Sequence, residues 1–211
     1  MSDQRIVDSI KKARDDKKRN FKQTFDLAIN LKNIDLRKAE NKIKFEVNIP
    51  NMIKENKIGL IVDALVSKTE GLNNVHVIKK DDLENLGKNK KLSKKIAKEC
   101  SYFIAEAPMM PLVGKNIGSV LAPRNLMPKP VPPTANLEAL VGRARKTVRI
   151  QLKDSPVIHL AIGTEDMDDE KIADNADVVI QGVISNLPKG RDQIKNYVIK
   201  MTMGKPVKFT M

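Results

Sequence analysis

Few residues in this sequence could carry out catalytic chemistry. The chain has two histidines, His76 and His159, and one cysteine, Cys100, so no Cys and His cluster can bind zinc or an iron–sulfur centre. Neither a G-x-G-x-x-G nor a G-x-x-x-x-G-K-[ST] motif is present, so the backbone cradle that these motifs provide for nucleotide phosphates is missing. We therefore expect no enzyme, no cofactor and no metal.

The remaining polar candidates have plainer explanations. His76 and His159 lie in apolar runs that predict strands, where a histidine packed into the core is the usual interpretation. The acidic run 165–170 could bind a divalent cation. It also precedes a predicted helix, and carboxylates are stabilised at the positive end of a helix. The helix interpretation is preferred.

The sequence is strongly basic, with 39 Lys and Arg against 26 Asp and Glu and a formal charge of +13. Such a surface favours an anionic partner, and nucleic acid is the most abundant one. The basic excess lies in the first 150 residues. With no Trp, 2 Tyr and 5 Phe, extended stacking on bases is not expected.

One segment concentrates this charge. Residues 86–100 predict a helix with lysines on one face and Leu92, Ile96 and Cys100 on the core face. The lysines could contact phosphates without reading sequence, or they could form an ordinary solvated helix face, and the two interpretations are equally supported. The lysines at helical spacing are Lys88, Lys91, Lys95 and Lys98.

The two ends of the chain predict one α+β layer. Apolar residues alternate over 21–31, where Gln23 is the only polar member of the alternate positions, and again over 43–49, as in half-buried strands. The last third adds predicted strands and a helix, so that both ends together can form a sandwich-like domain. These segments are strands 157–162, 197–201 and 207–211 and helix 168–187.

The middle of the chain predicts a different architecture. Apolar runs alternate with helical segments, which indicates a parallel, Rossmann-like α/β unit, and the Pro-rich segment 108–133 follows as an ordered loop. The sequence thus predicts two domains, one split between 1–58 and 150–211 and the other inserted at 59–149. The apolar runs are 58–66, 75–78 and 102–105, and a helix over 137–147 closes the unit.

No apolar run at the N-terminus suggests a signal peptide, and no stretch of about 18 apolar residues predicts a membrane span. The expected location is the cytoplasm, with no membrane partner.

Two stretches of the sequence indicate function more specifically than the composition does. The first runs from Met110 to Gly118 and on from Leu121 to Pro130, and the second is Thr202-Met203-Gly204, with His159 to Gly163 upstream. In this order they resemble the L-one family of ribosomal proteins of the large subunit. The archaeal branch is most similar, through GTEDMDDEKIADN from Gly163 and MPKPVPP from Met127.

The resemblance implies a two-domain structural protein of the ribosome. Members of the family bind ribosomal RNA at the mobile stalk beside the exit site for deacylated tRNA, whose release the stalk assists. Many also repress translation by binding their own messenger RNA. The expected partners are therefore large-subunit ribosomal RNA, exit-site tRNA and the protein's own mRNA, and the free protein is expected to be a monomer.

The resemblance also implies where RNA binds. Its RNA face corresponds to the start of the first strand, to the strand histidine and to the Thr-Met-Gly turn. Weaker phosphate contacts are expected in the middle domain from Lys88, Lys91, Lys95, Lys98, Lys115 and Arg124. The residues of the main face are Phe21, Thr24, His159, Thr202, Met203 and Gly204.

The sequence departs from the family pattern in the loop of the middle domain. Ala122, Asn125 and Leu126 replace two glycines and a lysine, and Lys205 follows the turn where many relatives have Pro.

The alternative from a different functional class is a Rossmann-like enzyme that uses a nucleotide in the middle domain.

Overall fold

The computed structural model describes residues 4–15, 19–38, 41, 43–54, 56–63, 69, 72–152 and 155–210. Contacts divide the chain into two compact units. The first consists of Met1–Lys54 with Lys146–Met211, and the second of Glu55–Arg145. No helix within the described ranges is long and apolar enough to cross a membrane.

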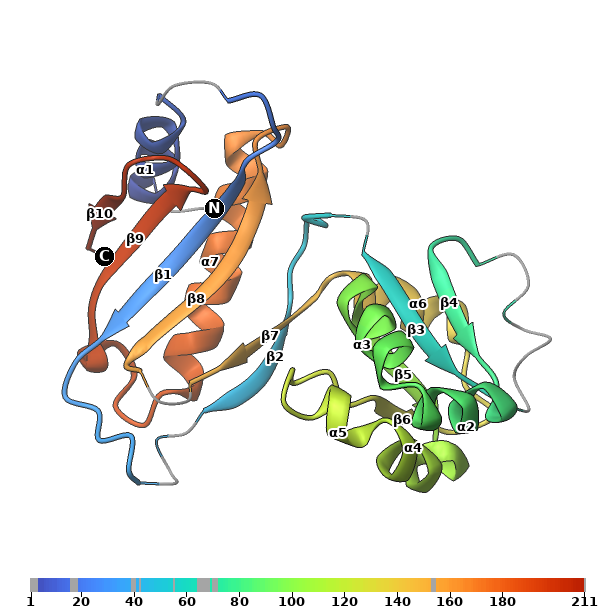
Figure 1. The fold of residues 1–211 in the computed structure, drawn as a ribbon. Helices are drawn as coiled ribbons and strands as arrows, with labels where there is room; N and C mark the ends of the chain where they lie inside the picture. Colours follow the sequence, from blue (N-terminus) through green and yellow to red (C-terminus); the bar gives the residue numbers. More distant parts are fainter. Residues whose placement is uncertain are drawn as a thin grey trace. The chain divides into compact units, whose positions relative to one another are not determined.

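The first unit is built on an antiparallel sheet that both chain ends supply. The strand order is β10-β9-β1-β8, so β1 from the N-terminal part lies between two strands from the C-terminal part (Figure 1). Thr24 pairs with Thr164, and Phe25 pairs with Met201. The strands are β1 (Thr24–Leu31), β8 (Val157–Thr164), β9 (Ile194–Met201) and β10 (Val207–Phe209).

Two helices cover one face of this sheet. Helix α1 (Gln4–Arg14) packs on β9 and β10, and α7 (Asp169–Asn186) packs on β8 (Figure 1). Side chains on β1 alternate between buried and half-buried because only one face meets this core. The other face carries polar side chains, among them Asp26, Asn30 and His159.

A second, two-stranded sheet belongs to the same unit. Strand β2 (Lys44–Asn48) pairs antiparallel with β7 (Thr147–Gln151), and Arg149 Nε donates to Glu46 Oε1 at 3.0 Å. Val47 and Ile150 join the core of the antiparallel sheet. The predicted boundary between residues 149 and 150 therefore falls inside β7.

The second unit contains a four-stranded parallel sheet in the order β4-β3-β5-β6. It is buried on both faces, because Phe103 and Ala105 of β5 enter one core cluster while Tyr102 and Ile104 enter another. The strands are β3 (Lys57–Ile61), β4 (Val75–Ile78), β5 (Cys100–Glu106) and β6 (Lys129–Val131).

Helices supply the two layers that enclose this sheet. Leu137 and Val141 of α6 (Leu137–Arg145) pack into one core cluster, and the other helices pack into the second. Those helices are α2 (Lys80–Lys88), α3 (Lys90–Glu99), α4 (Met110–Asn116) and α5 (Gly118–Leu121). Two 3-10 turns complete the described elements, η3 (Ala107–Met109) and η4 (Gly190–Gln193).

The coarse prediction is confirmed: an antiparallel sheet forms from both ends and a parallel sheet forms in the middle. The run 58–66 includes β3 from its second residue onward, but residues 64–66 lie outside the described residues, as does residue 211 of the last predicted strand.

Three local predictions are wrong. The Pro-rich segment 108–133 is not a loop, because it forms α4, α5 and β6. Segment 86–100 is not one helix, because Asn89 ends α2 and caps α3, accepting the Leu92 N–H at 3.3 Å. Of the predicted core face, Leu92 is 44% exposed, whereas Ile96 and Cys100 pack in the core beside the buried Ser93 and Ala97. His76 is exposed rather than packed in the core.

Candidate RNA interface

The Thr202–Gly204 turn lies against the start of β1 through a set of hydrogen bonds. Thr202 N–H donates to Thr24 O at 3.1 Å, and the Thr202 hydroxyl accepts from Thr24 N–H at 3.1 Å while donating to the same carbonyl at 3.3 Å. Gly204 N–H closes the turn on Met201 O at 3.0 Å. The Thr202 hydroxyl, predicted to contact RNA, is therefore engaged in fixing the backbone.

Gln23 connects this turn to the loop after β8. It is only 2% exposed, and its side-chain oxygen accepts the Met203 N–H at 3.2 Å. Its carbonyl accepts the Glu165 N–H at 2.9 Å, and its own N–H donates to Glu165 Oε2 at 3.3 Å. The start of β1, the turn after β9 and the loop after β8 therefore meet at one end of the sheet.

Two of the side chains that project from this end are large and apolar. Met203 is 60% exposed although its main-chain N–H is bonded to Gln23, and Phe21 is 50% exposed two residues before Gln23. Two exposed apolar side chains such as these can pack against a sugar or an unstacked base. Phe21, predicted to open the first strand, precedes β1, which begins at Thr24.

His159 does not lie at this end. It sits on β8 opposite Ala28, whereas Thr24 at the end of the sheet pairs with Thr164. Its side chain is exposed on the face opposite α1 and α7, so the interpretation of a core histidine is wrong for this residue too. The predicted face thus divides into an end cluster, made of Phe21, Thr24, Thr202, Met203 and Gly204, and a separate position on the open face.

The open face also carries an acid next to a lysine and a histidine. Asp26 pairs across the sheet with Lys200 on one side and Ala161 on the other. Partial burial raises the pKa of the Asp26 carboxyl, while Lys200 and His159 oppose that shift. The Asp26 carboxyl group therefore adds a half-buried hydrogen-bond acceptor to this face, which a patch made only of basic side chains would not offer.

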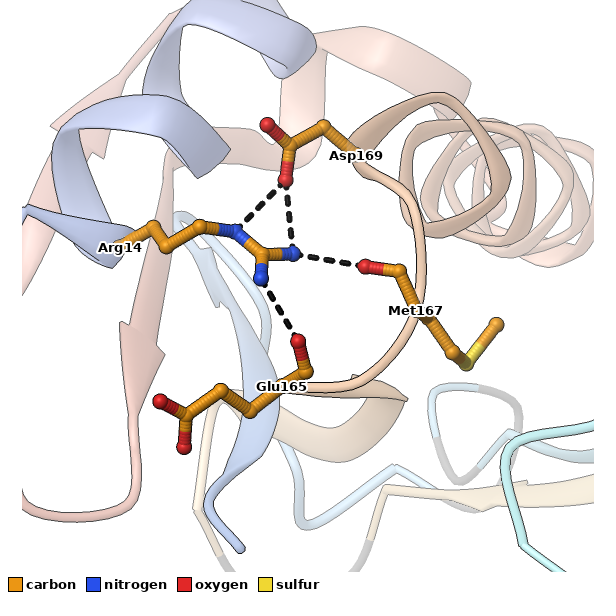
Figure 2. Close-up of polar contacts among 4 residues, drawn as sticks. All are labelled: Arg14, Glu165, Met167 and Asp169. Atoms are coloured by element: carbon orange, nitrogen blue, oxygen red, sulfur yellow. Dashed lines mark hydrogen bonds and ion pairs between the residues drawn. The ribbon is translucent and has the colours of Figure 1, made fainter. Parts of the chain in front are cut away.

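Arg14, at the end of α1, fixes the loop after β8 (Figure 2). Its Nε and Nη2 lie 2.9 Å and 2.8 Å from Asp169 Oδ1, Nη1 donates to Glu165 O at 2.6 Å, and Nη2 donates to Met167 O at 2.7 Å. The guanidinium also lies 5.3 Å from the centre of the Phe25 ring. A planar fork of donors suits this set of acceptors.

The acidic run is engaged in ion pairs. Lys22 Nζ lies 2.6 Å from Asp166 Oδ2, and its pKa is raised by hydrogen bonding to that carboxylate. Lys171 Nζ lies 2.6 Å from Asp168 Oδ2, and hydrogen bonding to Lys171 lowers the Asp168 pKa. Within the described ranges, no group of three or more acidic, His or Cys side chains could hold a metal ion.

The predicted phosphate contacts of the second unit are exposed and spread over several elements. Lys88 on α2 and Lys115 on α4 line one hollow of about 280 Å³ together with Glu84 and Asn116. Arg124 lies beside α3, where its Nη1 donates to Lys94 O at 3.4 Å. The other three predicted contacts, Lys91, Lys95 and Lys98, lie on α3.

Sequence reasoning missed Gln23, Glu165 and Arg14 as parts of this arrangement. The signal was present for Gln23, since a polar residue in an otherwise apolar alternation needs a buried partner. For Arg14 there was no signal, because its acceptors are mostly main-chain carbonyls about 150 residues away.

Comparison with known proteins identifies the family. The profile of the Ribosomal protein L1p/L10e family matches residues 10–205. Large ribosomal subunit protein uL1 of Thermococcus kodakarensis is 48% identical over 208 residues, covering 97% of this chain and 96% of that protein.

Two further archaeal proteins of the same name are similar over their whole length. The one from Methanothermobacter thermautotrophicus is 47% identical over 97% of this chain and 98% of its own length. The one from Methanocaldococcus jannaschii is 43% identical over 99% and 96%. The resemblance seen in the motifs is thereby confirmed, and this chain belongs to the Ribosomal protein L1p/L10e family.

Proposed function

We propose that this protein is a structural constituent of the large ribosomal subunit that binds ribosomal RNA at the mobile stalk beside the tRNA exit site. Membership of a ribosomal protein family, whose similar members carry the name of a large-subunit protein, is the observation that carries the proposal. The protein is non-enzymatic, as the sequence predicted, and acts without a cofactor. In free form it is a monomer.

The RNA face proposed here is the end cluster of the first unit, continued over the open face of the sheet. Its backbone is held by the Thr24–Thr202 hydrogen bonds, while Phe21 and Met203 project into solvent. Fixed backbone beside exposed apolar side chains can recognise one RNA shape, because little ordering is needed on binding. His159 extends the contact along β8 by a polar side chain.

The second unit, which we take to be an inserted Rossmann-like domain, contributes weaker phosphate contacts. Its candidate cations are exposed, and Lys88 and Lys115 converge on one hollow. Ammonium groups on an exposed surface attract phosphates without reading bases. The first unit, a split α+β domain, therefore supplies most of the specificity.

Two activities follow from the same RNA face. Movement of the stalk with this protein bound would assist release of deacylated tRNA from the exit site. A messenger RNA that repeats the stalk structure would bind the same face and allow the protein to repress its own translation.

Binding of the full chain to a stalk ribosomal RNA fragment tests the proposal. Filter binding should give tight, saturable binding to this fragment and much weaker binding to a scrambled duplex of equal length. The protein's own mRNA leader should compete with the fragment for one site. Equal affinity for fragment and scrambled duplex would refute specific recognition, and saturable thermal stabilisation by a nucleotide would favour the enzyme alternative.

A further inference from the structure

We propose that Gln23 is a positioning residue for RNA recognition: it holds the Thr202–Gly204 turn in its binding geometry and is itself held by Glu165 and Arg14. This inference rests on the proposed function, because it concerns the turn in the RNA face. It assigns a role in recognition to Gln23, Glu165 and Arg14, although none of them is proposed to contact RNA.

The first step is the geometry of Gln23 itself. Its side chain is buried, and the side-chain oxygen accepts the main-chain N–H of Met203, the most exposed large apolar residue of the described chain. Thr202 is fixed on one side of Met203 and Gly204 on the other, by their bonds to Thr24 O and Met201 O. The bond to Gln23 therefore sets the tilt of the peptide that carries the exposed Met203 side chain.

The second step is how Gln23 is kept in place. Its main-chain N–H and C=O both bond to Glu165, one to the carboxylate and one to the N–H. A residue tied through its main chain on both sides can direct its side chain with little conformational freedom. The loop after β8 thus determines where the Gln23 oxygen lies.

The third step is Arg14, which fixes that loop. Figure 2 shows its guanidinium between Glu165, Met167 and Asp169, with donors aimed at two carbonyls and one carboxylate. Lysine could not reproduce this fork, because its ammonium is a single point donor. Arg14 therefore acts through the loop on the turn, and its charge is engaged inside the protein rather than by phosphate.

The competing explanation is that Gln23 only stabilises the fold. The chain offers a matched control in Gln193, which is 4% exposed and accepts the Lys189 N–H through its side-chain oxygen at 3.1 Å. Its carbonyl also accepts a main-chain N–H, from Lys32 at 2.7 Å. Gln193 precedes β9, whereas the Thr202–Gly204 turn follows that strand, so it lies at the other end of the sheet.

The test compares Gln23→Met with Gln193→Met in the full chain. Each change removes one buried acceptor at nearly constant size, so both should lower the melting temperature similarly. Only Gln23→Met should weaken binding to the stalk RNA fragment, by roughly threefold to tenfold for one lost hydrogen bond. Equal RNA affinity of the two variants, at a temperature where both are folded, would overturn the proposal.

Amide hydrogen exchange gives a readout that needs no RNA. In the wild-type chain the Met203 N–H should exchange slowly, like the Lys189 N–H, and Gln23→Met should accelerate exchange at Met203 alone. Fast exchange at Met203 in the folded wild-type chain would refute the positioning role even if the variant did not fold. Failure of the wild-type chain to bind the fragment would instead refute the proposed function, and hydrogen exchange would still decide whether Gln23 holds the turn.

Discussion

The two units of this protein present their polar residues in opposite ways. In the first unit, the Thr202–Gly204 turn is bonded to buried or main-chain partners and leaves apolar side chains exposed. In the second, Lys91, Lys95 and Lys98 project from α3, and none of them forms an ion pair within the described ranges. Fixed geometry favours discrimination between RNA shapes, whereas mobile cations favour attraction to any polyanion.

The sheets explain this difference. The parallel sheet of the second unit is enclosed by a core cluster on each face, so its functional groups must come from helices and loops. The antiparallel sheet of the first unit packs α1 and α7 on one face and keeps half-buried polar side chains on the other. A platform that already exists in the free protein loses little entropy on binding.

The largest effect is expected from separating the units. A chain that joins Lys54 to Lys146 through a short Gly-Ser linker keeps β7 with β2 and should fold with most of the RNA affinity of the full chain. Residues 55–145 alone should bind near the non-specific level, roughly a thousandfold more weakly or worse. Filter binding measures this difference, and circular dichroism checks that both proteins are folded. High affinity of residues 55–145 would show that the second unit, not the first, is the main RNA binder.

A moderate effect is expected at the turn. Thr202→Ala removes a hydroxyl that both donates to and accepts from Thr24, so RNA affinity should fall by about twofold to tenfold. Thr202→Ser keeps the hydroxyl and should bind RNA nearly as well as the wild-type chain. If the two variants bind alike, the hydroxyl does not contribute to recognition.

A smaller effect is expected from the lysines of the second unit. Changing Lys88, Lys91, Lys95 and Lys98 to Gln removes four charges, and we expect the salt dependence of RNA affinity to flatten by about one contact, roughly 0.9 in slope. Affinity should be measured for the stalk fragment and a scrambled duplex across a salt series. If the slope of log affinity against log salt concentration flattens by several units with the stalk fragment, the second unit is the principal binder.

The smallest effect is expected at Cys100, a buried reporter of the second unit. Burial raises the pKa of its thiol to about 11, so the thiolate is scarce at pH 8 and alkylation of the native chain should be slow. Saturating stalk RNA should leave this rate unchanged, because we propose that the main RNA face lies on the first unit. Strong slowing by RNA, measured by mass spectrometry, would show that binding restrains the second unit.

The same pKa predicts a pH dependence of stability. The folded state holds the Cys100 proton more tightly than the unfolded chain, whose thiol titrates near 9.0, so this contribution is complete below pH 9 and is lost as pH rises toward about 11. The Cys100→Ala variant should therefore lose less stability than the wild-type chain between pH 9 and pH 11. Thermal unfolding of both proteins across this pH range measures the difference.

Much of the fold could be predicted from hydrophobic periodicity. The alternation over 21–31 predicted β1 and the apolar run that begins at Ile58 predicted β3, because one-sided burial and two-sided burial leave different sequence patterns. The break at Asn89 was missed because Lys-rich sequence on either side has high helix propensity, and the cap is decided by one side chain.

The positions of the motif residues could be predicted only in part. The Thr-Met-Gly motif drew attention to the turn, but nothing in the sequence indicated that the Thr202 hydroxyl bonds to Thr24. His76 was expected in the core because its neighbours are apolar, and the apolar run around His159 favoured the same interpretation, whereas the family resemblance placed His159 on the RNA face. On a strand at the surface, however, alternate residues face solvent, and both histidines are exposed.

Protection of main-chain amides by bound RNA tests the central claim most directly. Hydrogen exchange of the full chain, with and without the stalk ribosomal RNA fragment, would show which unit the RNA covers. We predict that protection on binding concentrates at residues 21–24 and 202–204, with little change over α3. Protection concentrated over α3 and around Lys115, with exchange at the turn unchanged, would contradict the claim that the first unit recognises RNA.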